Sequence, residues 1–207
     1  MDRANFFQRW SELHGNVKVE GIVRGWLTLS YVIIKPLTFL RISPNLVTIG
    51  GLVFSIALWR HNGSWWGVLF LALSLLCDGI DGSLAIARHK ESVRGSTLDA
   101  IIDRLAEVFW ALTFYAIGGH FEIIFLAWLF AFTQEYARAR MGGLGIQEVG
   151  IVSIAERPVR ASLLGIALIA NLMFLNFVEP IALIWLGMQA YSLVAVMRYG
   201  YLRLKKT

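Results

Sequence analysis

The chain has 207 residues, of which 57% are apolar and only 16% are charged, and its mean hydropathy is +0.62. This composition excludes an ordinary soluble domain of that size. The net charge of +5 does not indicate a nucleic-acid-binding protein, because the basic residues flank apolar segments instead of forming one block. The single cysteine, Cys77, excludes an intramolecular disulfide framework.

Residues 1–41 form the first predicted region, an N-terminal arm followed by an amphipathic helix at the membrane interface. From 17 to 40, apolar residues are mixed with lysine, arginine and glutamate, a pattern typical of a helix lying in the membrane surface. Aromatic residues of this region, Phe6 and Trp10 among them, are expected to anchor it at the level of the lipid headgroups. For residues 1–16, a short solvated arm packed on the domain stays open as an alternative.

The second region, 42–207, contains six apolar segments long enough to cross a bilayer as helices. The first begins at Ser43-Pro44, a serine N-cap followed by a proline at the first helical position. The predicted spans are 44–59, 64–88, 97–117, 121–140, 158–177 and 179–199. The sequence therefore predicts an all-α, polytopic membrane protein with six transmembrane helices that follow an interfacial amphipathic helix.

The orientation in the membrane follows from the basic residues. Lysine and arginine gather before the first span, between the second and third, between the fourth and fifth, and after the sixth, up to Lys205 and Lys206. The positive-inside rule places these segments, and with them both termini, in the cytoplasm. An even number of spans also leaves both termini on one side. We expect an integral protein of a prokaryotic cell membrane with a cytoplasmic active site.

Four aspartates lie in two neighbouring apolar segments. Asp78 and Asp81 are three residues apart, and Asp99 and Asp103 are four apart. On a helix, residues at either spacing share one face. The second and third spans run antiparallel and are joined by the short loop 88–96, so we expect the four carboxylates to converge near the cytoplasmic ends of these helices.

Charged carboxylates inside spanning helices need compensation. One carboxylate at a helix centre costs about 2.5–3.5 kcal/mol on the insertion scale, and four that repel each other cost more. Divalent cations remove both problems, and carboxylate oxygens favour Mg²⁺, Mn²⁺ or Ca²⁺ over zinc, for which no Cys/His cluster exists. Four carboxylates suffice for two ions that bind the attacking and leaving oxygens of a phosphoryl group.

The aspartates belong to a longer motif with a specific spacing. It is Asp, two residues, Asp-Gly, two residues, Ala-Arg, eight residues, Gly, three residues, Asp, three residues, Asp. The positions in register here are Asp78, Asp81, Gly82, Ala85, Gly95, Asp99 and Asp103. Over these 26 residues the chain closely resembles the signature of the CDP-alcohol phosphotransferases, and the six predicted spans extend the resemblance over most of the protein.

The resemblance implies a role for each motif residue. Two divalent ions, Mg²⁺ or Mn²⁺, would be bound by Asp78, Asp81, Asp99 and Asp103. Asp103 would also be the general base that takes the proton of the acceptor hydroxyl. The nucleotide of a CDP-linked lipid would lie against Gly82, Ala85, Arg88 and Gly95. Of these, Gly82 and Ala85 are small and would leave room for the nucleotide to approach the helix. The resemblance further implies a homodimer.

One position departs from the motif. The family has arginine where this chain has Ile86, and Arg88 follows two residues later. On a helix, two residues turn the side chain by about 200°, so Arg88 replaces the arginine only if the helix end unwinds. If the family arginine supports the diphosphate of the donor, the departure weakens nucleotide binding or indicates a different donor. A catalytically inactive homologue is the third alternative.

Arginines on the predicted cytoplasmic side indicate the acceptor. The stretch containing Arg138 and Arg140, followed by the stretch containing Arg157, resembles the branch of the family that uses inositol 1-phosphate. Guanidinium groups suit a doubly charged phosphate because they offer paired donors. These three arginines are the predicted binding site for the acceptor phosphate, although each could instead be a simple topology marker.

The predicted function is therefore metal-dependent transfer of a phosphatidyl-type group from a CDP-linked lipid, CDP-diacylglycerol or an archaeal equivalent, to a phosphorylated polar alcohol. The predicted acceptor is inositol 1-phosphate, and CMP is released. Glycerol 3-phosphate is the alternative acceptor. A divalent-cation transporter is the alternative from another class, since intramembrane aspartates also mark ion paths.

Overall fold

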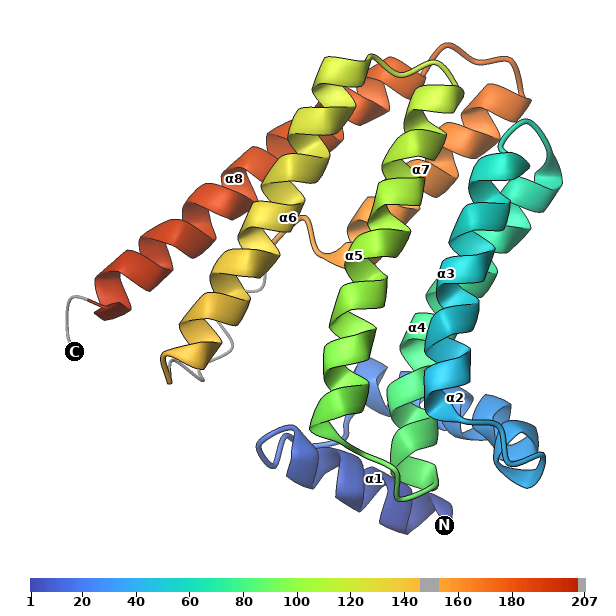
Figure 1. Ribbon diagram of the computed structural model, residues 1–207, viewed down its shortest axis with the longest axis vertical. Helices are drawn as coiled ribbons and strands as arrows, with labels where there is room; N and C mark the ends of the chain where they lie inside the picture. Colours follow the sequence, from blue (N-terminus) through green and yellow to red (C-terminus); the bar gives the residue numbers. More distant parts are fainter. Residues whose placement is uncertain (146–152, 205–207) are drawn as a thin grey trace. The chain divides into compact units, whose positions relative to one another are not determined.

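The computed structural model describes residues 1–145 and 153–204, so the predicted topology markers Lys205 and Lys206 lie outside the described residues. Every regular element in the described ranges is a helix (Figure 1). The helices are α1 (Arg3–Leu13), α2 (Gly21–Phe39), α3 (Pro44–Arg60), α4 (Trp65–Ala87), α5 (Val93–Ala116), α6 (Phe121–Gly143), α7 (Arg157–Leu172) and α8 (Val178–Leu204). The predicted all-α fold is confirmed.

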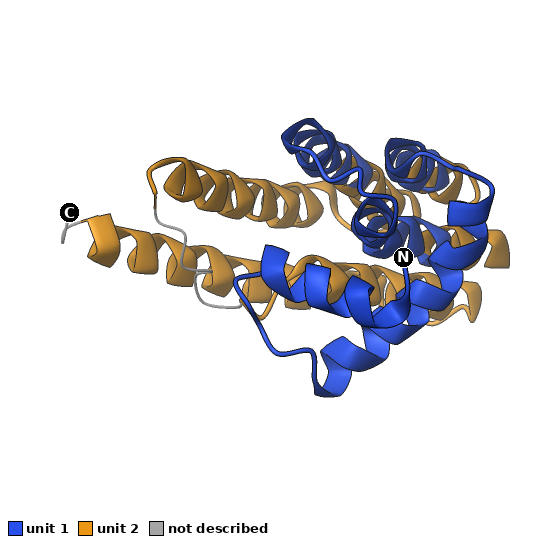
Figure 2. Cartoon of the chain, turned by 90° about the horizontal axis from the view of Figure 1, so that it is seen from below, with its two compact units in different colours: residues 1–54, 72–106 blue, residues 55–71, 107–207 orange. Residues whose placement is uncertain are grey.

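The chain divides into two compact units (Figure 2). Unit 1 comprises Met1–Phe54 and Ala72–Ala106, and unit 2 comprises Ser55–Leu71 and Glu107–Thr207. The helices α3, α4 and α5 each run from one unit into the other. The division predicted near residue 41 stays a prediction.

Unit 1 is built around a buried apolar cluster that includes α1. Phe6 of α1 is fully buried together with Leu27 of α2 and Leu84 of α4. The expectation that Phe6 anchors the chain among lipid headgroups is therefore wrong, because its ring fills the core of this unit. The helix α1 begins at an N-cap, Asp2, whose carboxylate accepts a hydrogen bond from the Asn5 N–H at 2.8 Å.

In unit 1, the Trp26 side chain of α2 packs directly against the backbone of α4 at Gly79. A Cβ atom added at Gly79 would lie 2.5 Å from Cζ2 of Trp26. No side chain can be added there without moving the indole, so Gly79 allows the close approach of the two helices. Trp26 thereby lies beside the helical turn that contains Asp78.

In unit 2, α6 and α7 both pack against α8, and Figure 1 shows the yellow α6 beside the red α8. The packing faces bury small residues such as Ala127, Ala131 and Ala182, which allow close helix approach. Gln189 of α8 donates to Oε1 of Gln134 in α6 at 2.9 Å. Both amides are fully buried, so this hydrogen bond fixes the two helices in register.

The six predicted spans are not confirmed as six. Among the described residues, α4 and α8 are long and apolar enough to cross a membrane, and α2 and α3 pass the same test together but are bent by 111°. The helix α3 has only 17 residues and α7 only 16, while α5 contains five charged residues between Arg94 and Glu107. The apolar helices still indicate an integral membrane protein.

Candidate active site

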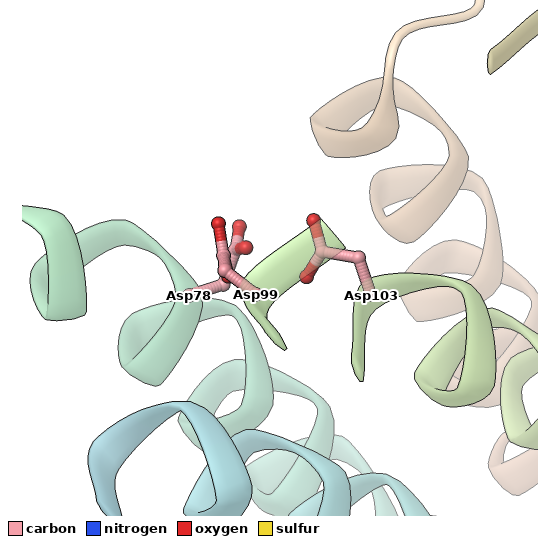
Figure 3. Close-up of side chains that lie close together, drawn as sticks. All are labelled: Asp78, Asp99 and Asp103. Atoms are coloured by element: carbon pink, nitrogen blue, oxygen red, sulfur yellow. The ribbon is translucent and has the colours of Figure 1, made fainter. Parts of the chain in front are cut away.

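Three of the four aspartates come together within unit 1. One carboxylate oxygen each from Asp78 of α4 and from Asp99 and Asp103 of α5 lies within 4.8 Å of the others (Figure 3). The helix α5 begins four residues earlier than predicted because Ser92 caps it, accepting a hydrogen bond from the Gly95 N–H at 3.0 Å. The resulting helical face presents Asp99 and Asp103 toward Asp78.

The fourth aspartate lies outside this cluster. Oδ2 of Asp81 accepts a hydrogen bond from the hydroxyl of Thr48 at 2.6 Å, and Oδ1 accepts one from the Gly82 N–H. Asp81 and Thr48 are both buried. Thr48 could not be recognised from the sequence, since a single threonine one turn into a helix is no signal by itself.

The cluster adjoins a cavity of about 840 Å³ within unit 1, which is lined by Asp78, Asp81 and Asp99. Its volume is in the range of ordinary ligand sites. Residues of several helices contribute to its wall, including Pro44 and Asn45 at the start of α3. The aspartates therefore lie beside a space large enough for a ligand.

The predicted nucleotide-binding residues are only partly brought together. Gly82, Ala85 and Gly95 line the cavity. Arg88 does not line it, because its guanidinium donates to the carbonyl oxygen of Ile42. Arg88 follows Ala87, the last residue of α4, and its role in nucleotide binding stays a prediction.

A substitution at Gly82 tests the cavity as a nucleotide site. An added Cβ atom at Gly82 would meet nothing within 4 Å, so Gly82→Val is expected to fold normally while its side chain fills part of the cavity. The KM for the CDP-linked lipid should rise about 10-fold or more, because the added side chain keeps the nucleotide from close contact with α4. Kinetics with each substrate varied in turn would measure this. Gly187→Val is the matched control, since Gly187 lies in α8 in equally open space. An unchanged donor KM would contradict the assignment.

The carboxylate cluster suits a divalent metal. Hard oxygen ligands from three side chains on two helices match the preference of Mg²⁺ and Mn²⁺. Without a cation, the negative charges would repel each other in an apolar setting. Asp78, Asp99 and Asp103 are therefore the residues of unit 1 that could bind an ion together, and Asp81 lies beside them on the cavity wall.

The predicted acceptor arginines lie in unit 2. Arg138 of α6 forms a paired contact with Glu156, the residue before α7, with N–O distances of 3.0 and 2.7 Å. Burial acts to raise the pKa of Glu156, but hydrogen bonds from Arg138 and the Ser153 N–H outweigh it and lower the pKa to about 2. Glu156 is therefore ionised at neutral pH.

Arg157 begins α7 and belongs to the same polar network. Its guanidinium lies over the Trp110 ring, 5.1 Å from the centroid, and 3.8 Å from Oε1 of Glu107. Arg160, which sequence analysis did not select, donates to the same Glu107 oxygen at 2.7 Å and lies 3.8 Å from Glu135. Since Glu135 is also 3.5 Å from Arg138, the charges alternate in one continuous network.

Arg140 does not join that network in the described part of the chain. Its side chain is exposed near the end of α6, two residues beyond Arg138 and so on another side of the helix. The structure thus brings two of the three predicted arginines together and leaves the third apart.

The fold and site define a helical integral membrane protein with an acidic site formed by two of its helices. The chain belongs to the CDP-alcohol phosphatidyltransferase family, and the match to that family covers residues 36–198. It is therefore a transferase.

Named relatives come from archaea and bacteria. An archaetidylinositol phosphate synthase of Pyrococcus horikoshii is 31% identical over 71% of this chain and 86% of that protein. One from Aeropyrum pernix is 31% identical over 58% of this chain and 65% of its own length. A phosphatidylinositol phosphate synthase of Mycolicibacterium smegmatis is 27% identical, and the match covers 65% of each protein.

Proposed function

We propose that the protein transfers a phosphatidyl-type group from a CDP-linked lipid to inositol 1-phosphate and releases CMP. The observation that carries this proposal is the cluster of Asp78, Asp99 and Asp103 beside a ligand-sized cavity. The family accounts for the donor class. The names of the relatives, which are synthases of inositol phosphate lipids, support this acceptor.

The reaction is a displacement at the lipid-linked phosphorus of the donor. The acceptor hydroxyl oxygen forms the new P–O bond, the bond to the bridging oxygen of the diphosphate breaks, and CMP leaves with that oxygen. Asp103 accepts the hydroxyl proton as this bond forms. Asp78, Asp81, Asp99 and Asp103 would bind two divalent ions, Mg²⁺ or Mn²⁺, which neutralise charge on the diphosphate when bound.

The setting of the reaction is proposed from the charges of the chain. Basic residues flank the apolar helices at both ends of the chain and in two loops, so the site and both termini would face the cytoplasm. The archaeal and bacterial relatives are consistent with a prokaryotic cell membrane. A homodimer remains part of the proposal by analogy with the family.

Arg138, Arg140 and Arg157 would bind the phosphate of the acceptor. Arg138 already presents two N–H groups to a carboxylate, Glu156, in the geometry that a phosphate would also accept. Arg157 lies in the same network of charges. An acceptor phosphate would therefore exchange with Glu156 as the partner of Arg138.

Arg138→Ala is expected to raise the KM for inositol 1-phosphate by about 10- to 100-fold, because a charge-assisted pair of hydrogen bonds is lost. The KM for the CDP-linked lipid should change less than 2-fold. Steady-state kinetics with each substrate varied in turn would measure both. Arg60→Ala serves as the control, since Arg60 is an exposed arginine beyond this network. Arg138→Lys should recover part of the loss. Equal increases in both KM values would contradict the role.

An assay of acceptors tests the proposed function as a whole. Purified protein would be given a CDP-linked lipid, with diacylglycerol or ether-linked tails, and radiolabelled inositol 1-phosphate, glycerol 3-phosphate or free inositol, each with Mg²⁺ or Mn²⁺. Lipid-soluble product from inositol 1-phosphate, with matching CMP release, supports the proposal. Product from glycerol 3-phosphate alone would replace the acceptor. No CMP release with any acceptor would refute the reaction.

A further inference from the structure

The cavity beside the aspartates extends to a part of the chain that lies outside the family match. That match begins at residue 36, whereas α1 spans Arg3–Leu13. Arg9 and Trp10 of α1, and His14 directly after it, line the same cavity as Asp78 and Asp99. Residues that precede the family match therefore contribute to the cavity wall together with the motif.

Three contacts fix α1 within unit 1. Phe6 is fully buried in the apolar cluster that also contains Ile86, the residue that stands where the family motif has arginine. Nε of Arg9 donates to Oε1 of Glu91, in the loop between α4 and α5, at 3.0 Å. The Tyr31 hydroxyl of α2 donates to the Met1 carbonyl oxygen at 3.0 Å. The helix is thus a packed part of the cavity wall.

An aromatic pair lines the α1 side of the cavity. The rings of Trp10 and His14 are stacked, with centroids 4.0 Å apart and planes inclined by 17°. Nδ1 of His14 lies 2.8 Å from the Trp10 carbonyl oxygen, which can only accept, so this nitrogen donates and fixes the imidazole. Flat aromatic side chains in a pocket are surfaces on which nucleobases stack.

A cation lies on the same cavity wall. Lys90, in the loop before α5, lines the cavity with an exposed side chain that forms no ion pair in the part of the chain that the structure describes. Arg9 is different, because Glu91 and Glu12 both bind it. Lys90 is therefore the lining cation available to a phosphate group, and lysine binds phosphates as a flexible point charge.

We propose that α1 and the loop residue Lys90 form the nucleotide end of the donor site, where the base stacks on Trp10 and the diphosphate contacts Lys90. This inference rests on the proposed function and adds donor-binding residues beyond the motif. Between Trp10 and the aspartates the cavity would accept the cytidine diphosphate group in one orientation. The apolar side chain of Ile86, which is buried in the same cluster as Phe6, cannot bind a phosphate, so this contact falls to Lys90.

Binding of soluble CDP in the presence of Mg²⁺ to the full-length protein tests the proposal. Isothermal titration calorimetry in detergent would give Kd for wild type, Trp10→Leu, Trp10→Phe, Lys90→Met and Lys90→Arg, with inorganic diphosphate as a second probe. We expect Trp10→Leu to weaken CDP about 10-fold and diphosphate less than 2-fold, because only the base stacks. Lys90→Met should weaken both about 5- to 20-fold. Trp10→Phe and Lys90→Arg should recover most of the affinity.

The controls are Trp66→Leu and Lys35→Met, which alter an exposed tryptophan and a lysine that do not line this cavity. CDP affinity unchanged in both Trp10→Leu and Lys90→Met would overturn this inference and leave the proposed function intact. Equal weakening of CDP and diphosphate by Trp10→Leu would overturn the stacking assignment. Failure of the wild type to bind CDP would overturn both proposals.

Discussion

Asp103→Asn is expected to lower kcat by about 10²- to 10⁴-fold, the usual contribution of general-base catalysis. The amide has the same shape as the carboxylate but cannot accept the proton of the acceptor hydroxyl. Asp103 lies on the helical face of α5 that also contains Asp99, within the carboxylate cluster. Turnover of the purified variant, measured as CMP release, would determine the loss.

The binding measurements distinguish loss of a base from loss of the site. CDP should bind the Asp103→Asn variant within a few-fold of wild type in titration calorimetry, because the cavity is lined by Asp78, Asp81 and Asp99 rather than by Asp103. Asp2→Asn is a suitable control, since an asparagine still caps α1. Turnover near that of the wild type would refute the role of Asp103.

Addition of Mg²⁺ or Mn²⁺ is expected to raise the Tm of the metal-depleted protein, and chelation should abolish activity. Binding to the folded state at 100 times Kd stabilises by about 2.7 kcal/mol. For a protein of this size, that corresponds to a rise of roughly 5–10 °C. Thermal unfolding in detergent, with and without each ion, would measure the shift without depending on activity.

The double variant Asp78→Asn, Asp99→Asn should lose this Tm shift. Two of the three clustered carboxylates are then neutral, so the ion loses two of its ligands and the repulsion between the carboxylates also falls. Without metal the variant is expected to be at least as stable as the wild type. A Tm shift equal to that of the wild type would show that the ion binds elsewhere.

Spacing alone predicted much of the acidic site. Asp99 and Asp103 are four residues apart on one helix, so their shared face follows from helix geometry. Their approach to Asp78 follows from the short antiparallel connection between α4 and α5. The distinct environment of Asp81 could not be predicted, because its partner Thr48 comes from α3, and such a contact depends on packing between helices distant in sequence.

Packing also explains what the sequence left open or predicted wrongly. Phe6 was expected at the membrane surface because aromatic residues of amphipathic segments commonly lie there. In the structure, its side chain is buried in the apolar cluster of unit 1. The pairing of Arg138 with Glu156 joins residues 18 positions apart across an irregular connection. No periodic pattern in the sequence indicates which arginine will pair with Glu156.

The glycine at position 82 lowers the stability of α4. Glycine inside a helix is less favourable than alanine by about 1 kcal/mol, and nothing near Gly82 would obstruct a methyl group. A laboratory selection for heat tolerance alone would therefore favour alanine at this position. The same methyl group would narrow the cavity next to Asp81, so the most heat-resistant descendants of this chain should be poorer catalysts.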